Sequence, residues 1–222
     1  MLLTQVEFRA SCLLFDMDGT LINSHAPVIR AYTDWAAQHG LDAAMVLREC
    51  QGRRVIDTVR ALAPAGTDIE ADTAALKQRE LDDVDGIVEI PGARALLESL
   101  ADDRWAVVTS AERPLAIRRM QAAGLPIPRF LFTSDDIARG KPAPDGFIAG
   151  AKALGAEPEQ ALVFEDSAAG IKSGLAASSR VIALTSTLDV SQIDALQPSG
   201  YLHDFLSVKV FNDEGQLLFR IA

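Results

Sequence analysis

The chain has 222 residues, of which 49% are hydrophobic and 23% are charged, enough for one packed core with a small second lobe. Its net charge of -10 argues against a nucleic-acid-binding protein, which would be expected to carry a basic excess. No signal peptide or membrane-spanning segment is evident, so we expect a cytoplasmic protein without a membrane partner.

Short apolar runs alternate with helical patterns over much of the chain. Uninterrupted apolar runs of this length suit strands that are buried on both faces, as in a parallel sheet. The predicted strands are 12–15, 105–108, 130–132, 161–164 and 181–184. The predicted helices are 91–100, 114–123, 144–154 and 167–177. This alternation predicts an α/β fold with a doubly wound, Rossmann-like parallel sheet.

One long segment interrupts this alternation with helical patterns alone. From about residue 25 to residue 85, helices are predicted at 28–39, 54–63 and 68–83, and no strand-like run occurs. We therefore expect an inserted α-helical cap at 23–86 and an α/β core made of 1–22 and 87–222. Long insertions in α/β folds most often lie over the carboxyl ends of strands, where ligands bind. The end of the chain, 208–221, is predicted to form a hairpin.

The first predicted strand ends in two acidic residues, Asp16 and Asp18, followed by Gly19 and Thr20. Residues two apart in an extended chain face the same way, so both carboxylates can point into one site. Two close carboxylates repel, and one tends to keep a proton unless a cation lies between them. One acid can then attack a substrate while the other acts as general acid and then as general base.

Three further polar motifs follow predicted strands, in chain order. Each is weak alone: Thr109–Ser110 can be a helix cap, Lys141 a solvated loop residue, and Glu165–Asp166 a complement to a helix dipole. Together with the first motif, DMDGTL, they resemble the four motifs of the haloacid dehalogenase superfamily of phosphatases. The resemblance covers nearly the whole chain.

The resemblance implies a Mg²⁺-dependent phosphatase that forms an aspartyl-phosphate. Asp16 would be the nucleophile and Asp18 the general acid and base. Thr109 and Ser110 would bind the phosphoryl group, and Lys141 would neutralise the phosphate and the nucleophile. The implied metal ligands are Asp16, Asp18 through its backbone carbonyl, Asp166, and Glu165 directly or through water.

The helical insertion resembles the small cap of the subgroup that contains beta-phosphoglucomutase and many sugar and polyol phosphatases. A loop at 50–54 joins two cap helices, and the resemblance implies that it reads the leaving group. Gly52 would shape the loop and Arg53 would make the contact, with Arg54 as a second choice. The motif strings look closest to hexose-phosphate, 2-deoxyglucose-6-phosphate and glycerol-phosphate phosphatases, although Gln51 stands where these often have histidine.

Three other functions remain open on the sequence. A phosphosugar mutase of the beta-phosphoglucomutase type would keep all four motifs and differ in its cap. A dehalogenase would lack the second acid of the first motif, so Asp18 argues against it. A retired binding module would be expected to have lost a motif, and none is lost. We therefore expect a monomeric enzyme whose partner is a small phosphorylated metabolite, a sugar or polyol phosphate.

Overall fold

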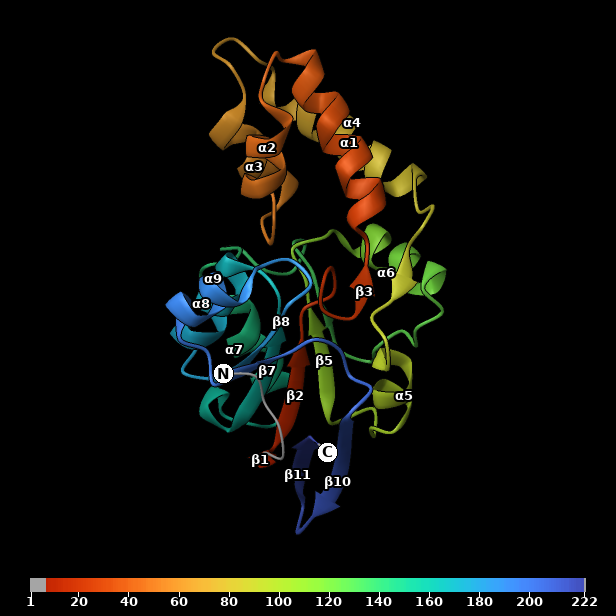
Figure 1. The fold of residues 1–222 in the computed structure, drawn as a ribbon, viewed down its shortest axis with the longest axis vertical. Helices are drawn as coiled ribbons and strands as arrows, with labels where there is room; N and C mark the ends of the chain where they lie inside the picture. The colour runs from red at the N-terminus through yellow and green to blue at the C-terminus, as the bar shows by residue number, and fades with distance from the viewer. Residues whose placement is uncertain (1–6, 222) are drawn as a thin grey trace.

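A parallel sheet forms the centre of this computed structural model, which describes residues 7–221. Within that range the sheet has six strands in the order β6-β5-β2-β7-β8-β9, all parallel (Figure 1). The predicted doubly wound α/β fold is confirmed, while residues 1–6 of the predicted core and residue 222 lie outside the described range. The strands are β2 (Cys12–Phe15), β5 (Trp105–Val108), β6 (Leu131–Phe132), β7 (Ala161–Glu165), β8 (Arg180–Leu184) and β9 (Gly200–Leu202).

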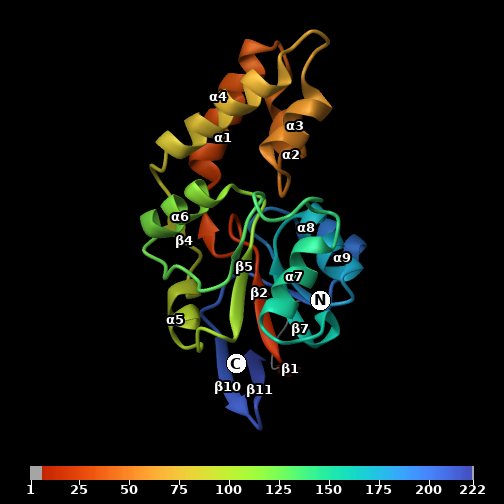
Figure 2. The same ribbon diagram turned by 180° about the vertical axis from the view of Figure 1, so that it is seen from behind.

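Alternate strand residues face opposite sides of the sheet, and each side has its own hydrophobic core. Leu13 and Phe15 pack with helices α5 and α6, whereas Leu14 packs with α7, α8 and α9 (Figures 1 and 2). Each fully buried Leu or Phe stabilises the fold by about 1.5–3 kcal/mol, so the strands need apolar residues on both faces. The helices are α5 (Ala93–Glu98), α6 (Arg113–Ala122), α7 (Asp145–Ala153), α8 (Ala168–Ala176), α9 (Val190–Leu196) and the short 3₁₀ helix η1 (Pro158–Gln160).

A group of helices with its own hydrophobic cluster lies beyond the carboxyl ends of the strands, at the top of Figure 1. Tyr32, Trp35 and Leu76 are buried in that cluster. The longest of these helices have 14 residues, and no helix within 7–221 is long and apolar enough to cross a membrane. The helices are α1 (His25–Gln38), α2 (Ala43–Glu49), α3 (Val55–Leu62) and α4 (Ile69–Asp82). We call them the helical lobe; its division from the core at residues 23 and 86 remains a prediction.

The chain enters and leaves the helical lobe side by side. Strands β3 (Ile22–Asn23) and β4 (Val88–Glu89) pair antiparallel at this crossing. Helix α2 was not among the predicted helices, and its start shows the signal that could have found it. The Asp42 side chain accepts hydrogen bonds from the backbone N–H groups of Ala44 and Met45, which marks Asp42 as an N-cap.

A small antiparallel sheet lies at the end of the molecule opposite to the helical lobe (Figure 2). The predicted hairpin is confirmed as β10 (Val208–Asp213) paired with β11 (Gln216–Ile221). Strand β1 (Glu7–Ala10) pairs with β11 on its other side, which the sequence analysis did not anticipate. Phe219 of β11 packs on Phe164 with ring centroids 5.1 Å apart, so the hairpin covers part of the sheet.

Candidate active site

Polar side chains meet at the carboxyl edge of the parallel sheet, where neighbouring strands end together. Asp16 directly follows β2, and its backbone N–H donates to the carbonyl of Phe164 in β7 at 2.9 Å. Thr109 directly follows β5, and its N–H donates to the carbonyl of Phe132 in β6 at 2.9 Å. These ladder bonds hold residues that are far apart in sequence at one edge of the sheet.

An acidic cluster lies at this edge, in the described part of the chain. One carboxylate oxygen from each of Asp16, Glu165 and Asp166 lies within 4.8 Å of the others, and all three side chains are buried. The ammonium of Lys141 donates to Asp16 and, at 2.7 Å, to Oε1 of Glu165. Three carboxylates thus face one ammonium, an excess of buried negative charge that a bound cation would reduce.

The pKa values of the cluster reflect this crowding. Burial raises the pKa of Asp16 well above its usual range, Lys141 opposes the shift, and the charges of Glu165 and Asp166 add to it. Burial, and next the charge of Glu165, raise the pKa of Asp166 to about 8. Burial lowers the pKa of Lys141, but the carboxylates of Asp16 and Glu165 outweigh it, so the pKa is raised. Lys141 therefore stays charged at neutral pH.

Both carboxylate oxygens of Glu165 accept hydrogen bonds from the protein. Its Oε2 accepts from the backbone N–H groups of Asp166 and Ser167, both at 2.8 Å, and from the Ser167 hydroxyl at 3.0 Å. Its Oε1 accepts from Lys141. These contacts orient the lysine and the start of α8. They favour a role for Glu165 through its charge or through water over direct ligation of a metal.

Asp166 is held by two hydroxyl groups from other loops. Thr20 donates to its Oδ1 at 3.2 Å, and Thr187 donates to its Oδ2. Thr187 also lies 3.3 Å from Nε2 of His25. The sequence analysis missed Thr187, because it follows β8 without any motif that marks it as a site residue.

The carboxylate of Asp18 lies outside the acidic cluster. Its Oδ1 accepts a hydrogen bond from Nη1 of Arg119 in α6 at 2.9 Å, and Nη2 of the same guanidinium donates to Oε1 of Glu80 in α4 at 2.9 Å. Arg119 and Glu80 were not predicted as site residues. Nothing in their local sequence distinguishes them from charged helical residues that are exposed to solvent.

The loop at 50–54 reaches from the helical lobe to the strand edge. The Ser110 hydroxyl donates to the backbone carbonyl of Gly52 at 2.8 Å. A β-carbon at Gly52 would lie 2.2 Å from the Ser167 hydroxyl, so only glycine permits this approach. Arg53 pairs with Glu49 at 3.2 Å, while Arg54 donates to the carbonyl of Ala138 at 3.1 Å. The loop therefore touches the core at Ser110, one of the predicted phosphate-binding residues.

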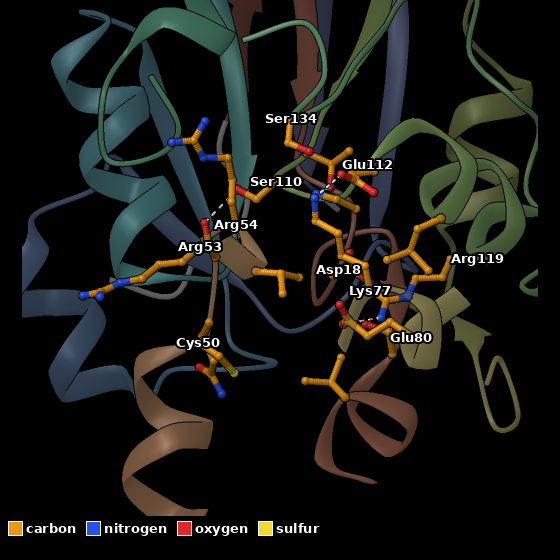
Figure 3. A pocket seen from close by; sticks show the side chains of 18 of the residues that line it. Asp18, Cys50, Arg53, Arg54, Lys77, Glu80, Ser110, Glu112, Arg119 and Ser134 are labelled. Atoms are coloured by element: carbon orange, nitrogen blue, oxygen red, sulfur yellow. Dashed lines mark hydrogen bonds and ion pairs between the residues drawn. The ribbon is translucent and has the colours of Figure 1, made fainter. Parts of the chain in front are cut away.

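A cavity of about 570 Å³ lies between the helical lobe and the strand edge. Arg53 and Arg54 lie on one side of it, and Lys77, Glu80 and Arg119 on the other (Figure 3). A volume of this size suits a small metabolite. The predicted site residues that line it are Asp16, Asp18, Gly52, Arg53, Thr109, Ser110 and Asp166, while Lys141 lies behind Asp16 and lines a smaller neighbouring cavity.

Comparison with known proteins assigns the chain to a family. The model of the haloacid dehalogenase-like hydrolases matches residues 10–178. The chain belongs to this family. Hexitol phosphatase A of Escherichia coli is 40% identical to it over 190 residues, covering 84% of this chain and 88% of that protein. Glycerol-1-phosphate phosphohydrolase 2 of Saccharomyces cerevisiae is 29% identical over 206 residues, covering 88% and 81%.

A solved structure shares the fold of this chain. The crystal structure of a hydrolase from Pseudomonas syringae superimposes with a TM-score of 0.79 at 25% sequence identity. The match covers 88% of this chain and 94% of that one, so it includes the helical lobe as well as the sheet. The arrangement of a lobe over the strand ends is thus shared with a solved member of this fold.

Gly19 allows the loop after β2 to approach Asp166, and this leads to a prediction. Its φ is +83°, and a β-carbon there would lie 2.0 Å from Oδ2 of Asp166. Gly19→Ala should lower the free energy of unfolding by about 1–2 kcal/mol for the left-handed backbone, and by about 1 kcal/mol or more for the steric conflict. Hydrolase activity should fall with it. Urea unfolding and initial rates measure the two effects.

A turn glycine supplies the matched control. Gly215 has the same φ of +83°, and a β-carbon added there would meet no atom within 4 Å, so Gly215→Ala carries only the backbone cost. We expect it to keep full activity and to lose only about 1–2 kcal/mol. Equal losses of stability and activity in the two variants would contradict the steric account of Gly19.

Proposed function

We propose that this protein is a Mg²⁺-dependent phosphatase of a sugar or polyol phosphate, acting through an aspartyl-phosphate on Asp16. The observation that carries the proposal is the buried cluster of Asp16, Glu165 and Asp166 with Lys141, open to a cavity of about 570 Å³. Membership of the haloacid dehalogenase-like hydrolases and the phosphatase names of the relatives support it.

The donor atoms of the cluster fit magnesium. Mg²⁺ prefers hard oxygen ligands and usually keeps several waters, and it is bound by one or two carboxylates together with substrate phosphate. Asp16 and Asp166 would supply the carboxylates and Asp18 its backbone carbonyl. Glu165 would add charge or act through water, since its own oxygens are already hydrogen-bonded. When bound, the ion would neutralise phosphate charge beside the anionic nucleophile.

The side chains around the cluster can divide the chemistry into two steps. A carboxylate oxygen of Asp16 forms a bond to phosphorus while the bond to the leaving oxygen breaks, and that oxygen takes a proton from Asp18. A water oxygen then bonds to phosphorus while the bond to Asp16 breaks, and the water proton passes to Asp18. Lys141 and Thr109 hold the phosphoryl oxygens through both steps. Inorganic phosphate leaves, and Asp16 and Asp18 return to their first state.

The helical lobe is proposed to act as a cap, residues 23–86, that closes over the substrate and excludes water. Its loop at 50–54 lies over the strand edge, where Gly52 and Arg53 line the cavity. The far wall holds charged residues, Lys77 and Glu80, which suit a substrate rich in hydroxyl groups. A polyol or sugar attached to the phosphate meets these requirements.

Metal dependence and substrate class are tested together by phosphate release. We expect activity with Mg²⁺ on one of hexitol phosphate, glycerol 1-phosphate or 2-deoxyglucose 6-phosphate, a loss of about 10²-fold or more with chelator, and recovery on adding excess Mg²⁺. Free phosphate should appear without any rearranged phosphate ester. Full activity in chelator would refute the dependence on Mg²⁺. Net isomerisation without free phosphate would favour the phosphosugar mutase.

A further inference from the structure

A single buried guanidinium connects the helical lobe to the proposed general acid. Arg119 lies in α6 of the core, and its Nη1 and Nη2 each donate at 2.9 Å, the first to Asp18 and the second to Glu80 (Figure 3). Glu80 belongs to α4, which packs against α6. The two acids therefore come from different parts of the chain, and their carboxylates are joined through one side chain.

The burial of Arg119 and Glu80 restricts the geometry of their contact. Arg119 is 3% exposed and Glu80 is 4% exposed, so water reaches little of either charge and each depends on its protein partner. A guanidinium presents its N–H groups in a rigid planar fork, so fixing one side of the fork on Glu80 also fixes the direction of the other. A displacement of Glu80 would consequently turn the N–H group that holds Asp18.

We propose that Arg119 is a positioning residue that aligns the Asp18 carboxyl for proton transfer, and that Glu80 makes this alignment depend on the helical lobe lying against the core. The inference rests on the proposed function, because it needs Asp18 as the proton donor and acceptor. It adds to that function a physical link between closure of the lobe and the proton-transfer step.

The hydrogen bond from Arg119 engages one oxygen of the Asp18 carboxyl and leaves the other for proton transfer. Oδ1 can accept from Arg119 whether the carboxyl is neutral or ionised, because a carbonyl oxygen and a carboxylate oxygen are both acceptors. Among residues 7–221 no hydrogen bond to Oδ2 is found, and the Asp18 side chain lines the cavity. Oδ2 is thus the atom that gives its proton to the leaving oxygen as the P–O bond breaks, and that later takes a proton from water.

Leaving groups of different basicity distinguish a loss of positioning of the Asp18 carboxyl from a general loss of activity. An alkoxide needs the proton of Asp18, whereas the acetate released from acetyl phosphate does not. Release of the leaving group in the first turnover is measured by rapid quench, with the alkyl phosphate that the wild type hydrolyses best and with acetyl phosphate. We expect Arg119→Met to slow alcohol release by about 10²-fold and acetate release by less than about 3-fold.

The Glu80 variants test the link to the helical lobe with Arg119 in place. Glu80→Ala removes the acceptor and should slow alcohol release by about 10-fold, while Glu80→Gln keeps an acceptor oxygen and should restore most of that rate. This pair also decides the question if Arg119→Met fails to fold. Equal rates in Glu80→Ala and Glu80→Gln would overturn the inference.

An ion pair of the helical lobe away from the cavity supplies the control. Arg30 of α1 pairs with Asp83 at 2.7 Å, and neither residue lines the cavity or touches Asp18. Arg30→Met should therefore change alcohol and acetate release by the same factor. If Arg119→Met also slows both leaving groups equally, or slows neither, Arg119 does not position Asp18.

A failure of the inference about Arg119 can be distinguished from a failure of the proposed function. If the wild type releases no phosphate, or if Asp16→Asn still turns over, the proposed function itself is wrong. If the wild type is active and Asp16→Asn is inert, the leaving-group comparison concerns Arg119 and Glu80 alone.

Discussion

Replacing Asp16 with asparagine is expected to abolish turnover while the protein stays folded. Asparagine has nearly the same shape but a neutral amide that does not attack phosphorus, so kcat should fall on the order of 10⁴-fold or more. The amide oxygen can still accept a hydrogen bond from Lys141, and the buried excess of negative charge becomes smaller. The midpoint of thermal unfolding should therefore be unchanged or higher.

The control for this variant is the same chemical change far from the cavity. Asp213 ends β10 and pairs at 2.6 Å with Arg9, at the end of the molecule opposite to the helical lobe. Asp213→Asn should leave kcat within about 2-fold and stability within about 0.5 kcal/mol. Phosphate release and circular-dichroism melting measure both variants. If kcat of Asp16→Asn lies within tenfold of the wild-type value, Asp16 is not the nucleophile.

The second large effect is expected from Lys141→Met. Lys141 donates to both Asp16 and Glu165, so its removal leaves two buried carboxylates without their common cation. Breaking a buried charge pair by deleting one partner typically costs about 3–5 kcal/mol, and we expect a loss of this size in the free energy of unfolding. Turnover should be lost as well, because the phosphoryl group loses its ammonium partner.

Chelator should be present in the unfolding measurement, since a bound cation would offset part of the lost positive charge. An exposed lysine of the terminal hairpin, Lys209, provides the matched change, and Lys209→Met should alter stability by no more than about 0.5 kcal/mol. If Lys141→Met unfolds at the same urea concentration as the wild type, the buried ion pairs do not hold the cluster together.

Much of the candidate site could be predicted from the chain because its residues follow strands. The runs at 12–15 and 161–164 are apolar throughout, since both faces of a parallel sheet are covered, and this makes strand ends visible in a sequence. Asp16 comes directly after the first run, and Asp166 follows the second run after one intervening residue, Glu165. The rule that parallel strands end at one edge then brings the two acids together, as the structure does.

Local reasoning reached its limit where partners are distant in sequence and lack a pattern. Strand β1 pairs with β11 at the other end of the chain, and its short run of mixed residues gives no periodic signal. Helix α2 has seven residues, too few for a clear hydrophobic period. The orientation of the Glu165 oxygens could not be predicted from the sequence either. It depends on backbone N–H groups that point at Oε2 only once α8 has formed.

The amino-acid sequence by itself determined the α/β class, the insertion of helices after the first strand and the acids, hydroxyls and lysine at the strand ends. These follow from apolar runs and short motifs, which are local properties of the chain. Only the tertiary structure decided which charges meet: Arg119 lies between Asp18 and Glu80, and Thr187 lies beside Asp166. Such contacts join elements through packing, and a buried charge takes its partner from whichever element the fold brings within hydrogen-bonding distance.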